Sequence, residues 1–291
     1  MTRLKADLGL LSVTVFWGTT FIVSKLLLSE MSLAVYMFYR MAVAALAMTL
    51  IALKFKKAWN KQVLRHGLIL GVLLYASYFF QMWGITQTSA SNAGFITGLS
   101  VVLVPVLGFL FYKEETPLQV WGSVILAVTG LLLLSGANPF KWSVGDLKVL
   151  ICAIIFAFHI IYTGRFSRVN NVYLLTAVQL VAIAAFSFLA FLPEVQTLST
   201  ISLKNVILLI YLALFGTVFT FLMQTSMQRF TTVARTAIIF SMEPVFAALF
   251  AFLIAGEKLT AEGWLGGLFI VLAMVNAEFP YQSLRRQKQK S

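Results

Sequence analysis

Long apolar runs alternate with short polar connections along the whole chain. Each run holds roughly 20 residues, the length at which an α-helix crosses the hydrocarbon core of a bilayer. The short connections favour antiparallel packing between successive helices. The pattern predicts ten spanning helices, at about residues 8–28, 33–53, 66–86, 92–111, 118–135, 145–164, 172–192, 204–224, 234–254 and 261–279.

The composition also indicates a multi-pass membrane protein. The chain is 60% hydrophobic and only 11% charged, whereas a soluble domain is about half apolar and about a quarter charged. The single cysteine, Cys152, falls within an apolar run, so the chain cannot form an internal disulfide. We expect Cys152 to be an inert core residue.

The positions of the charges explain the net charge of +12 without a nucleic-acid partner. With the N-terminus in the cytoplasm, most lysines and arginines fall in cytoplasmic connections, and Lys141, Lys148, Lys204 and Lys258 fall outside. This positive-inside bias predicts that both termini face the cytoplasm of a bacterial-type cell membrane. Residues 280–291 would then form a basic cytoplasmic tail lying against anionic lipid headgroups.

The two halves of the chain repeat. An offset of 143 residues aligns Gln81 with Gln224 and Glu114 with Glu257. Each half holds five spans, and an odd number inverts the second half relative to the first. We therefore expect an all-α membrane protein with ten transmembrane helices, arranged as two inverted five-helix repeats at residues 1–139 and 140–279.

Prolines interrupt corresponding spans of the two halves. Glu243 and Pro244 lie near the middle of the ninth span, and Pro105 lies within the fourth. A proline within a helix frees a backbone carbonyl, which can meet a ligand, a water or a neighbouring side chain. We expect helix breaks at Pro105 and Pro244, because twin broken helices point to a transport site. A simple packing kink is the alternative for both.

Two charged residues lie inside spans, where charge is costly and usually functional. Glu243 would bind a proton or a substrate amine, or else stay neutral and hydrogen-bonded within the bundle. Arg40 would bind an anionic substrate group or pair with Glu243. Its alternatives are a fixed structural pairing and a side chain that reaches the outer surface. Desolvation favours neutral Glu243, whereas a nearby cation would keep it charged.

Further candidates are polar or aromatic residues within spans, where such groups face the bundle interior. Gln81 and Gln224 share a repeat position, which favours a cavity role for both. His159 could titrate near neutrality, although a lone histidine is more often structural. Trp17 and Tyr78 could stack on an aromatic or cationic substrate, with packing as the alternative. The substrate or coupling-ion candidates are therefore Glu243, Arg40, Gln81, Gln224, Trp17, Tyr78, Asn92, His159 and Gln179.

Motifs spread over nearly the whole chain carry a family resemblance. They are Phe16-Trp17-Gly18, Arg40, Thr88-Ser89-Ala90-Ser91-Asn92-Ala93, Pro105, Glu114, Ala234-Arg235, Glu243-Pro244 and Gly256-Glu257-Lys258-Leu259-Thr260. With them the chain resembles the drug/metabolite transporter superfamily, in its ten-helix EamA-type branch. The resemblance implies a secondary carrier of amino acids, metabolites or drugs, often an exporter. It also implies that spans 1–4 and 6–9 surround a central cavity, with spans 5 and 10 peripheral.

The prolines depart from strict repetition. Pro105 lies nine residues before Glu114, whereas Pro244 lies thirteen before Glu257. The two helices therefore need not break at the same depth.

The sequence as a whole predicts a secondary transporter that moves a small molecule by alternating access, with proton coupling. No phosphate-binding glycine loop, metal-ligand spacing or nucleophile motif occurs, so we expect no catalytic residues, cofactor or metal. The alternatives are a channel-like protein and an intramembrane enzyme. An enzyme would need a clustered catalytic group, whereas the polar residues here are scattered.

Overall fold

The structure is a computed structural model that describes residues 3–88, 90–113, 116–136, 142–197, 201–255 and 260–278. Every regular element in those residues is helical, which confirms the all-α prediction. The first repeat contains α1 (Arg3–Leu28), α2 (Leu33–Ala52), α3 (Lys61–Ile85), α4 (Ala90–Gly98), α5 (Ser100–Tyr112) and α6 (Leu118–Ser135). The second repeat contains α7 (Val144–Phe166), α8 (Val172–Phe191), α9 (Leu203–Ala213), α10 (Thr220–Gln228), α11 (Val233–Phe240), α12 (Glu243–Ala255) and α13 (Ala261–Glu278).

Polar caps define where many of these helices begin. A side-chain oxygen before the helix accepts a hydrogen bond from a first-turn N–H group, which has no acceptor inside the helix. Each such cap stabilises a helix by about 1 kcal/mol. The capping residues are Ser32, Asn60, Ser143, Asn171, Ser202 and Thr232.

The helices make ten spans. Eight are continuous or jointed segments of 18 residues or more with apolar composition, and α6 and α13 add two shorter apolar helices. Three spans are jointed, because α4 with α5, α9 with α10, and α11 with α12 each follow one another along a single crossing. The ten-helix prediction therefore agrees with the structure, and α6 coincides with its predicted range.

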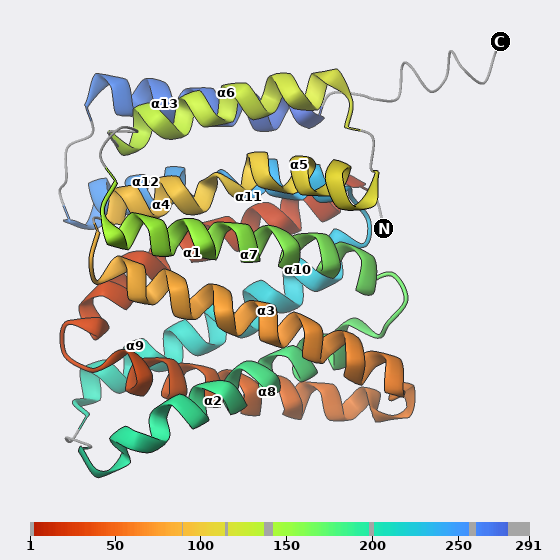
Figure 1. Cartoon of the computed structure of the whole chain (residues 1–291), viewed down its shortest axis with the longest axis vertical. Helices are drawn as coiled ribbons and strands as arrows, with labels where there is room; N and C mark the ends of the chain where they lie inside the picture. Colours follow the sequence, from red (N-terminus) through yellow and green to blue (C-terminus); the bar gives the residue numbers. More distant parts are fainter. Residues whose placement is uncertain are drawn as a thin grey trace.

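Equivalent helices of the two repeats lie next to each other. In Figure 1, α6 and α13 lie together at one edge of the molecule, and α2 and α8 lie together at the other. Between them, α3 packs on α7 and α8, and α1 packs on α10, α11 and α12. The two inverted repeats therefore interlock, and the paired fifth spans are peripheral.

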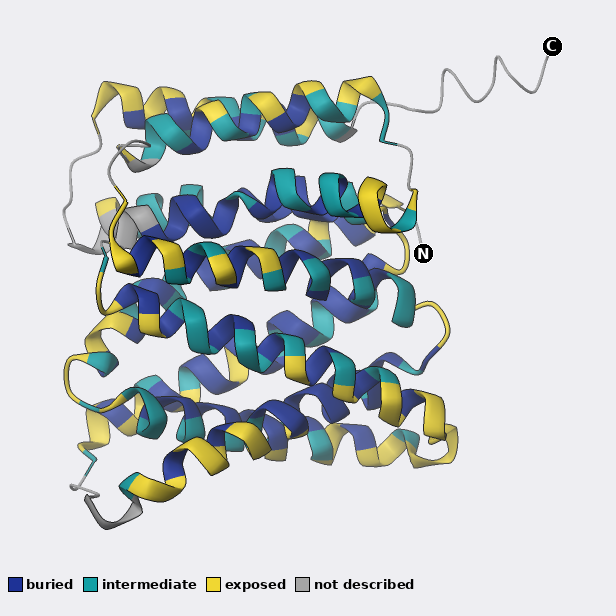
Figure 2. Ribbon diagram, in the orientation of Figure 1, coloured by how far each residue is buried: buried dark blue, intermediate teal, exposed yellow. Residues whose placement is uncertain are grey.

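The outer surface is apolar. Figure 2 shows exposed residues concentrated on the outward faces of the edge helices, with buried residues at the centre. The exposed side chains include Phe109, Phe111, Leu118 and Ile125. A soluble protein does not expose so much contiguous apolar surface, whereas lipid solvates it, so these faces are the ones that meet the bilayer.

The fourth span of each repeat is broken at equivalent positions. Leu99 separates α4 from α5, and two residues, Ser241 and Met242, separate α11 from α12. The repeat offset of 143 residues places Leu99 on Met242. The breaks therefore correspond, although the prolines do not.

The prediction that Pro105 marks the first break is wrong. α5 continues through Pro105, and the chain breaks earlier, at Leu99. Pro244 does lie beside a break, but as the second residue of α12. A proline in the first turn removes an N–H group that has no acceptor within the helix, so it is tolerated there.

Glycines allow α6 and α13 to cross closely. A Cβ atom built on Gly130 would lie 2.6 Å from the Gly266 carbonyl oxygen, and one on Gly266 would lie 2.5 Å from the Gly130 oxygen. Small residues let helix backbones approach within a membrane, where packing drives helix association. These two glycines therefore hold the two repeats together at their peripheral edge.

We predict that Gly130→Ala destabilises the protein, because a backbone oxygen cannot rotate away from the added methyl group. The expected loss is about 1–3 kcal/mol, measured as a lower midpoint of thermal unfolding in detergent. Gly122→Ala is the matched control on the same helix, because nothing lies within 4 Å of its added Cβ. Equal midpoints for the two variants would contradict the close crossing.

Candidate functional site

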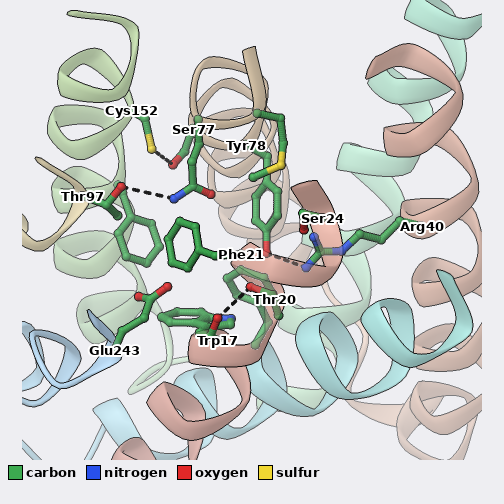
Figure 3. Close-up of a pocket in the computed structure, with 14 residues that line it drawn as sticks. Trp17, Thr20, Phe21, Ser24, Arg40, Ser77, Tyr78, Thr97, Cys152 and Glu243 are labelled. Atoms are coloured by element: carbon green, nitrogen blue, oxygen red, sulfur yellow. Dashed lines mark hydrogen bonds between the residues drawn. The ribbon is translucent and has the colours of Figure 1, made fainter. Parts of the chain in front are cut away.

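A small central cavity lies between the two repeats. Its lining comes from α1, α2, α3, α4, α7, α10 and α12, so both repeats contribute (Figure 3). The cavity volume is about 30 Å³, which holds about two water molecules. A metabolite does not fit in that volume, so the cavity is contracted in this conformation.

Aromatic rings form much of the cavity wall. The Trp17 ring lies 5.7 Å from Phe156, 5.7 Å from Phe221 and 5.0 Å from Phe240, measured between centroids. The Trp17 Nε1 group is buried and has no hydrogen-bond partner among the described residues. Apolar walls with a few polar groups are typical of small-molecule sites.

Glu243 supplies an acidic group to this cavity. It is the first residue of α12, directly after the helix break, and Figure 3 shows its carboxylate pointing into the cavity beside Trp17. The partial positive charge of a helix N-terminus favours a carboxylate there. Within the described chain, no hydrogen bond or ion pair joins this carboxylate to another side chain. The bundle partner that a purely structural Glu243 would need is therefore missing there.

Arg40 lies on the opposite side of the cavity from Glu243 (Figure 3). Its Nε donates to Thr217 Oγ1 at 3.0 Å, and its Nη1 donates to the Tyr36 hydroxyl at 2.6 Å. Its Nη2 donates to the Tyr78 hydroxyl and to the Gly216 oxygen, both at 3.2 Å. The predicted pairing of Arg40 with Glu243 is therefore wrong, because four neutral oxygens hold the guanidinium elsewhere.

A π-helix supplies two of the four oxygens that accept hydrogen bonds from Arg40. Residues Leu214–Phe219 form a π-helix between α9 and α10. π-Helical turns are rare and occur frequently at functional sites. The Gly216 oxygen accepts from both Arg40 and Thr220, and a Cβ on Gly216 would lie 2.8 Å from Thr20 Cγ2. The sequence pattern predicted a regular helix here and did not reveal this feature.

The repeat-related glutamines have different surroundings. Gln81 lines the cavity, and its Nε2 donates to Thr97 Oγ1 at 3.3 Å. Gln224 is fully buried, does not line the cavity, and donates to Gln228 Oε1 at 3.0 Å. The expectation that both glutamines share a cavity role therefore fails for Gln224, because the repeat alignment does not fix side-chain surroundings.

His159 and Gln179 form a polar chain outside the cavity lining. His159 Nε2 and Gln179 Oε1 are 3.0 Å apart, and Gln179 Nε2 donates to Thr225 Oγ1 at 3.3 Å. The His159 ring stacks on Phe156, whose other neighbours include Trp17. The structural alternative therefore fits both residues. The side chain of Asn92 and the whole of Glu114 and Glu257 lie outside the described residues.

Several cavity residues were missed from the sequence. Cys152 is a buried core residue, as expected, and it also lines the cavity, 3.3 Å from the Ser77 hydroxyl. Thr20 and Ser24 line the α1 side. Small residues on the inner face of a helix look alike in sequence whether they pack or line a cavity. No group of three or more metal-ligating side chains gathers among the described residues.

A second cavity, of about 400 Å³, lies between α5, α7 and α11. We call it the basic vestibule, because its lining includes Arg3, Arg165, Arg168 and Arg235. Pro105 lies in its wall rather than in the central cavity.

An ion pair joins the repeats beside this vestibule. Arg235 of α11 donates through Nη2 to Asp7 Oδ2 of α1 at 2.8 Å, and both side chains are less than a tenth exposed. Arg235 Nη1 also donates to the Ala277 oxygen at 3.2 Å, which adds α13 to the contact. We call the Asp7–Arg235 contact the inner contact.

The corresponding contact at the opposite end is a hydrogen bond. Thr88, which follows α3, donates through Oγ1 to Asp146 Oδ1 of α7 at 2.5 Å. Asp146 also closes a capping box with Ser143 at the start of α7. We call the Thr88–Asp146 contact the outer contact. Each contact joins the first span of one repeat to the segment at or just before the fourth span of the other.

Comparisons with known proteins agree with this architecture. A profile of the EamA-like transporter family matches residues 4–136 and 143–276. An uncharacterized transporter from Archaeoglobus fulgidus is 34% identical over 273 residues, covering 94% of this chain and 85% of the relative. The uncharacterized transporter YyaM of Bacillus subtilis is 24% identical, covering 95% and 94%. A solved crystal structure shares the fold at 17% identity, with a TM-score of 0.80 and coverage of 98% and 99%.

The family match spans both halves of the chain. The two relatives, both named uncharacterized transporters, align over 85% and 94% of their own lengths. The ten apolar spans and the shared central cavity are what such a protein requires. The chain therefore belongs to the EamA-like transporter family and is a multi-pass membrane transporter.

Proposed function

We propose that this transporter carries a small amphipathic solute by alternating access, and that Glu243 takes up and releases a proton during the cycle. The observation that carries the proposal is an acidic side chain with no protein partner in the described chain, facing a small cavity between two repeats. A buried carboxylate is stable only when protonated or paired with a cation. A proton and a substrate amine are the two cations that can alternate at Glu243.

Alternating access follows from the two contacts that join the repeats. A solute enters the central cavity only if the repeats separate at one end, because the present volume holds only water. The inverted repeats make the two ends pseudo-equivalent, so breaking one contact at a time opens one side at a time. The Asp7–Arg235 ion pair would close the cytoplasmic end, and Thr88–Asp146 would close the outer end.

Export is the favoured direction. With the termini in the cytoplasm, as the distribution of lysine and arginine indicates, the basic vestibule opens toward the cytoplasm. A cavity of about 400 Å³ is large enough to admit a small metabolite before the inner contact opens. Loading from the cytoplasm followed by release outside is export.

The alternatives fit the geometry less well. A channel needs a continuous path wide enough for its solute, whereas the central cavity holds only about two water molecules in this conformation. An enzyme needs a nucleophile beside a base, and the serines and the cysteine of the described cavity lining have no such neighbour: Ser77 meets only Cys152, and Ser24 meets the Tyr36 hydroxyl.

We predict that Glu243→Gln abolishes accumulation driven by a proton gradient while solute exchange continues, because glutamine mimics the protonated acid. Proteoliposomes supplied with a panel of radiolabelled amines and zwitterions measure both quantities. Glu262→Gln is the matched control, since Glu262 also lies in a first helical turn but is exposed. Gradient-driven accumulation at the wild-type rate in Glu243→Gln would remove Glu243 as the coupling site.

We predict that loosening either contact exposes Cys152, the only cysteine and a cavity residue. An impermeant thiol reagent should label the Asp7→Asn/Arg235→Gln variant several-fold faster than wild type from the cytoplasmic side. It should label Thr88→Val faster from the outer side. The double change avoids leaving an unpaired buried arginine, which costs about 3–5 kcal/mol.

Glu262→Gln is the control for this labelling experiment, because Glu262 is exposed in the first turn of the peripheral helix α13. Its labelling rate should equal that of wild type. Faster labelling from the same side in both contact variants would show that the two contacts do not guard opposite ends.

A further inference from the structure

Arg40 carries a full positive charge in the protein interior, and no described residue supplies it with a counter-ion. Its side chain is 1% exposed, and an arginine keeps its proton under all physiological conditions. Its hydrogen-bond partners are Tyr36, Tyr78, Thr217 and the Gly216 carbonyl, and none of them is ionised at neutral pH. Neutral oxygens solvate a buried charge but do not cancel it, so such an arginine usually marks a place where an anion binds.

Other described carboxylates are bonded elsewhere or lie across the cavity from Arg40. Glu243 lies across the cavity, as Figure 3 shows. Glu30 pairs with Lys204 and accepts from Asn205 at the protein surface. Glu194 accepts a hydrogen bond from Ser32 in an exposed contact. No described carboxylate forms an ion pair with Arg40.

The guanidinium is also incompletely bonded on the Tyr36 side. A guanidinium has five N–H donors, and four of them have the acceptors named above. Within the described chain, the second N–H of Nη1 has no acceptor. An incoming carboxylate can accept from Nη1 in the charge-assisted geometry that arginine favours.

Two tyrosine hydroxyls frame this position. Tyr36 and Tyr78 each accept one hydrogen bond from Arg40, and the Tyr78 ring centroid lies 5.0 Å from the guanidinium carbon. Figure 3 shows Tyr78 reaching from the cavity toward Arg40. The Tyr36 hydroxyl is also hydrogen-bonded to Ser24 Oγ at 2.7 Å, whereas the Tyr78 hydroxyl, which accepts from Arg40 beside the cavity, can still donate its own proton to a carboxylate.

We propose that Arg40, with Tyr78, binds a carboxylate of the transported solute, so that this transporter selects zwitterions. The amine of the solute lies toward Glu243, and its apolar body lies against Trp17 and Phe221. This inference rests on the proposed function, because it places the carboxylate of the solute in the same cavity, on the side opposite Glu243. Arg40 is then the specificity-determining residue for the anionic group.

The test compares matched acids and amides that differ only at the proposed contact. The probes are leucine against leucinamide, and 6-aminohexanoate against 6-aminohexanamide, which separates its charges further. Binding is measured as thermal stabilisation of the purified protein over a range of ligand concentrations. Wild type should bind at least one acid about 10- to 100-fold more tightly than its amide, the range for hydrogen bonds to charged groups.

Substitution of Arg40 should remove this preference selectively. Arg40→Gln should weaken the acid about tenfold or more and leave the amide unchanged, whereas Arg40→Lys should retain part of the preference. An arginine that only joins α2 to the π-helix would instead affect acid and amide equally. Tyr78→Phe supplies the test if both arginine variants fail to fold. It removes one hydroxyl and should weaken the acid about threefold to tenfold.

Amides that bind wild type as tightly as their acids, in both pairs, would overturn the proposal, and so would an unchanged preference in Arg40→Gln. Both are equilibrium measurements made without a gradient. Failure of the proposed proton coupling appears separately, as gradient-driven flux that persists in Glu243→Gln. The two failures are therefore distinguishable.

Discussion

The separation of a basic and an acidic side chain across one cavity is the constraint on which the structure depends. Opposite charges 4 Å apart near a protein surface attract by about 4 kcal/mol, so an ionised Glu243 would form an ion pair with Arg40 if either could move. Four hydrogen bonds hold Arg40 against α2, α3 and the π-helix. Glu243 is fixed at the start of α12, just after the helix break. The cavity therefore keeps a basic side chain on one side and an acidic side chain on the other, and one solute can contact both.

The inverted repeats explain how one cavity can serve both sides of a membrane. Helix breaks at corresponding positions in α4–α5 and α11–α12 make the fourth span of each repeat a jointed helix. The inner and outer contacts occupy related places but differ in chemistry, because one is an ion pair and the other a hydrogen bond from a neutral hydroxyl. The repeats are thus alike in backbone and different in side chains. Two further pairs of repeat-related positions differ in the same way. Arg40 corresponds to Gln179, and Gln81 lines the cavity whereas its counterpart Gln224 does not.

The fold was predictable from sequence because lipid imposes one apolar length on every span. Five cavity residues were also predictable, since charged and polar groups inside a membrane are costly and usually functional. They are Glu243, Arg40, Trp17, Tyr78 and Gln81. The Arg40–Glu243 pairing was not predictable, because the depth of a residue in its span does not give its direction. The π-helix and the break at Leu99 depend on tertiary contacts that leave no local pattern. Pro105 misled for the same reason, since α5 accommodates it within a regular helix.

The central claim is that the two ends of the cavity open in turn, and the most direct measurement is a pair of distances in one protein. Spin labels on a Cys152→Ser background would report the inner end through positions 4 and 230, and the outer end through positions 86 and 147. All four lie on exposed sites beside the inner and outer contacts. Double electron–electron resonance should reveal two states as the pH and the zwitterion concentration change. In one state the inner distance is long and the outer distance short, and in the other the outer distance is long and the inner distance short. Two distances that remain fixed, or that lengthen together, would contradict alternating access around this cavity.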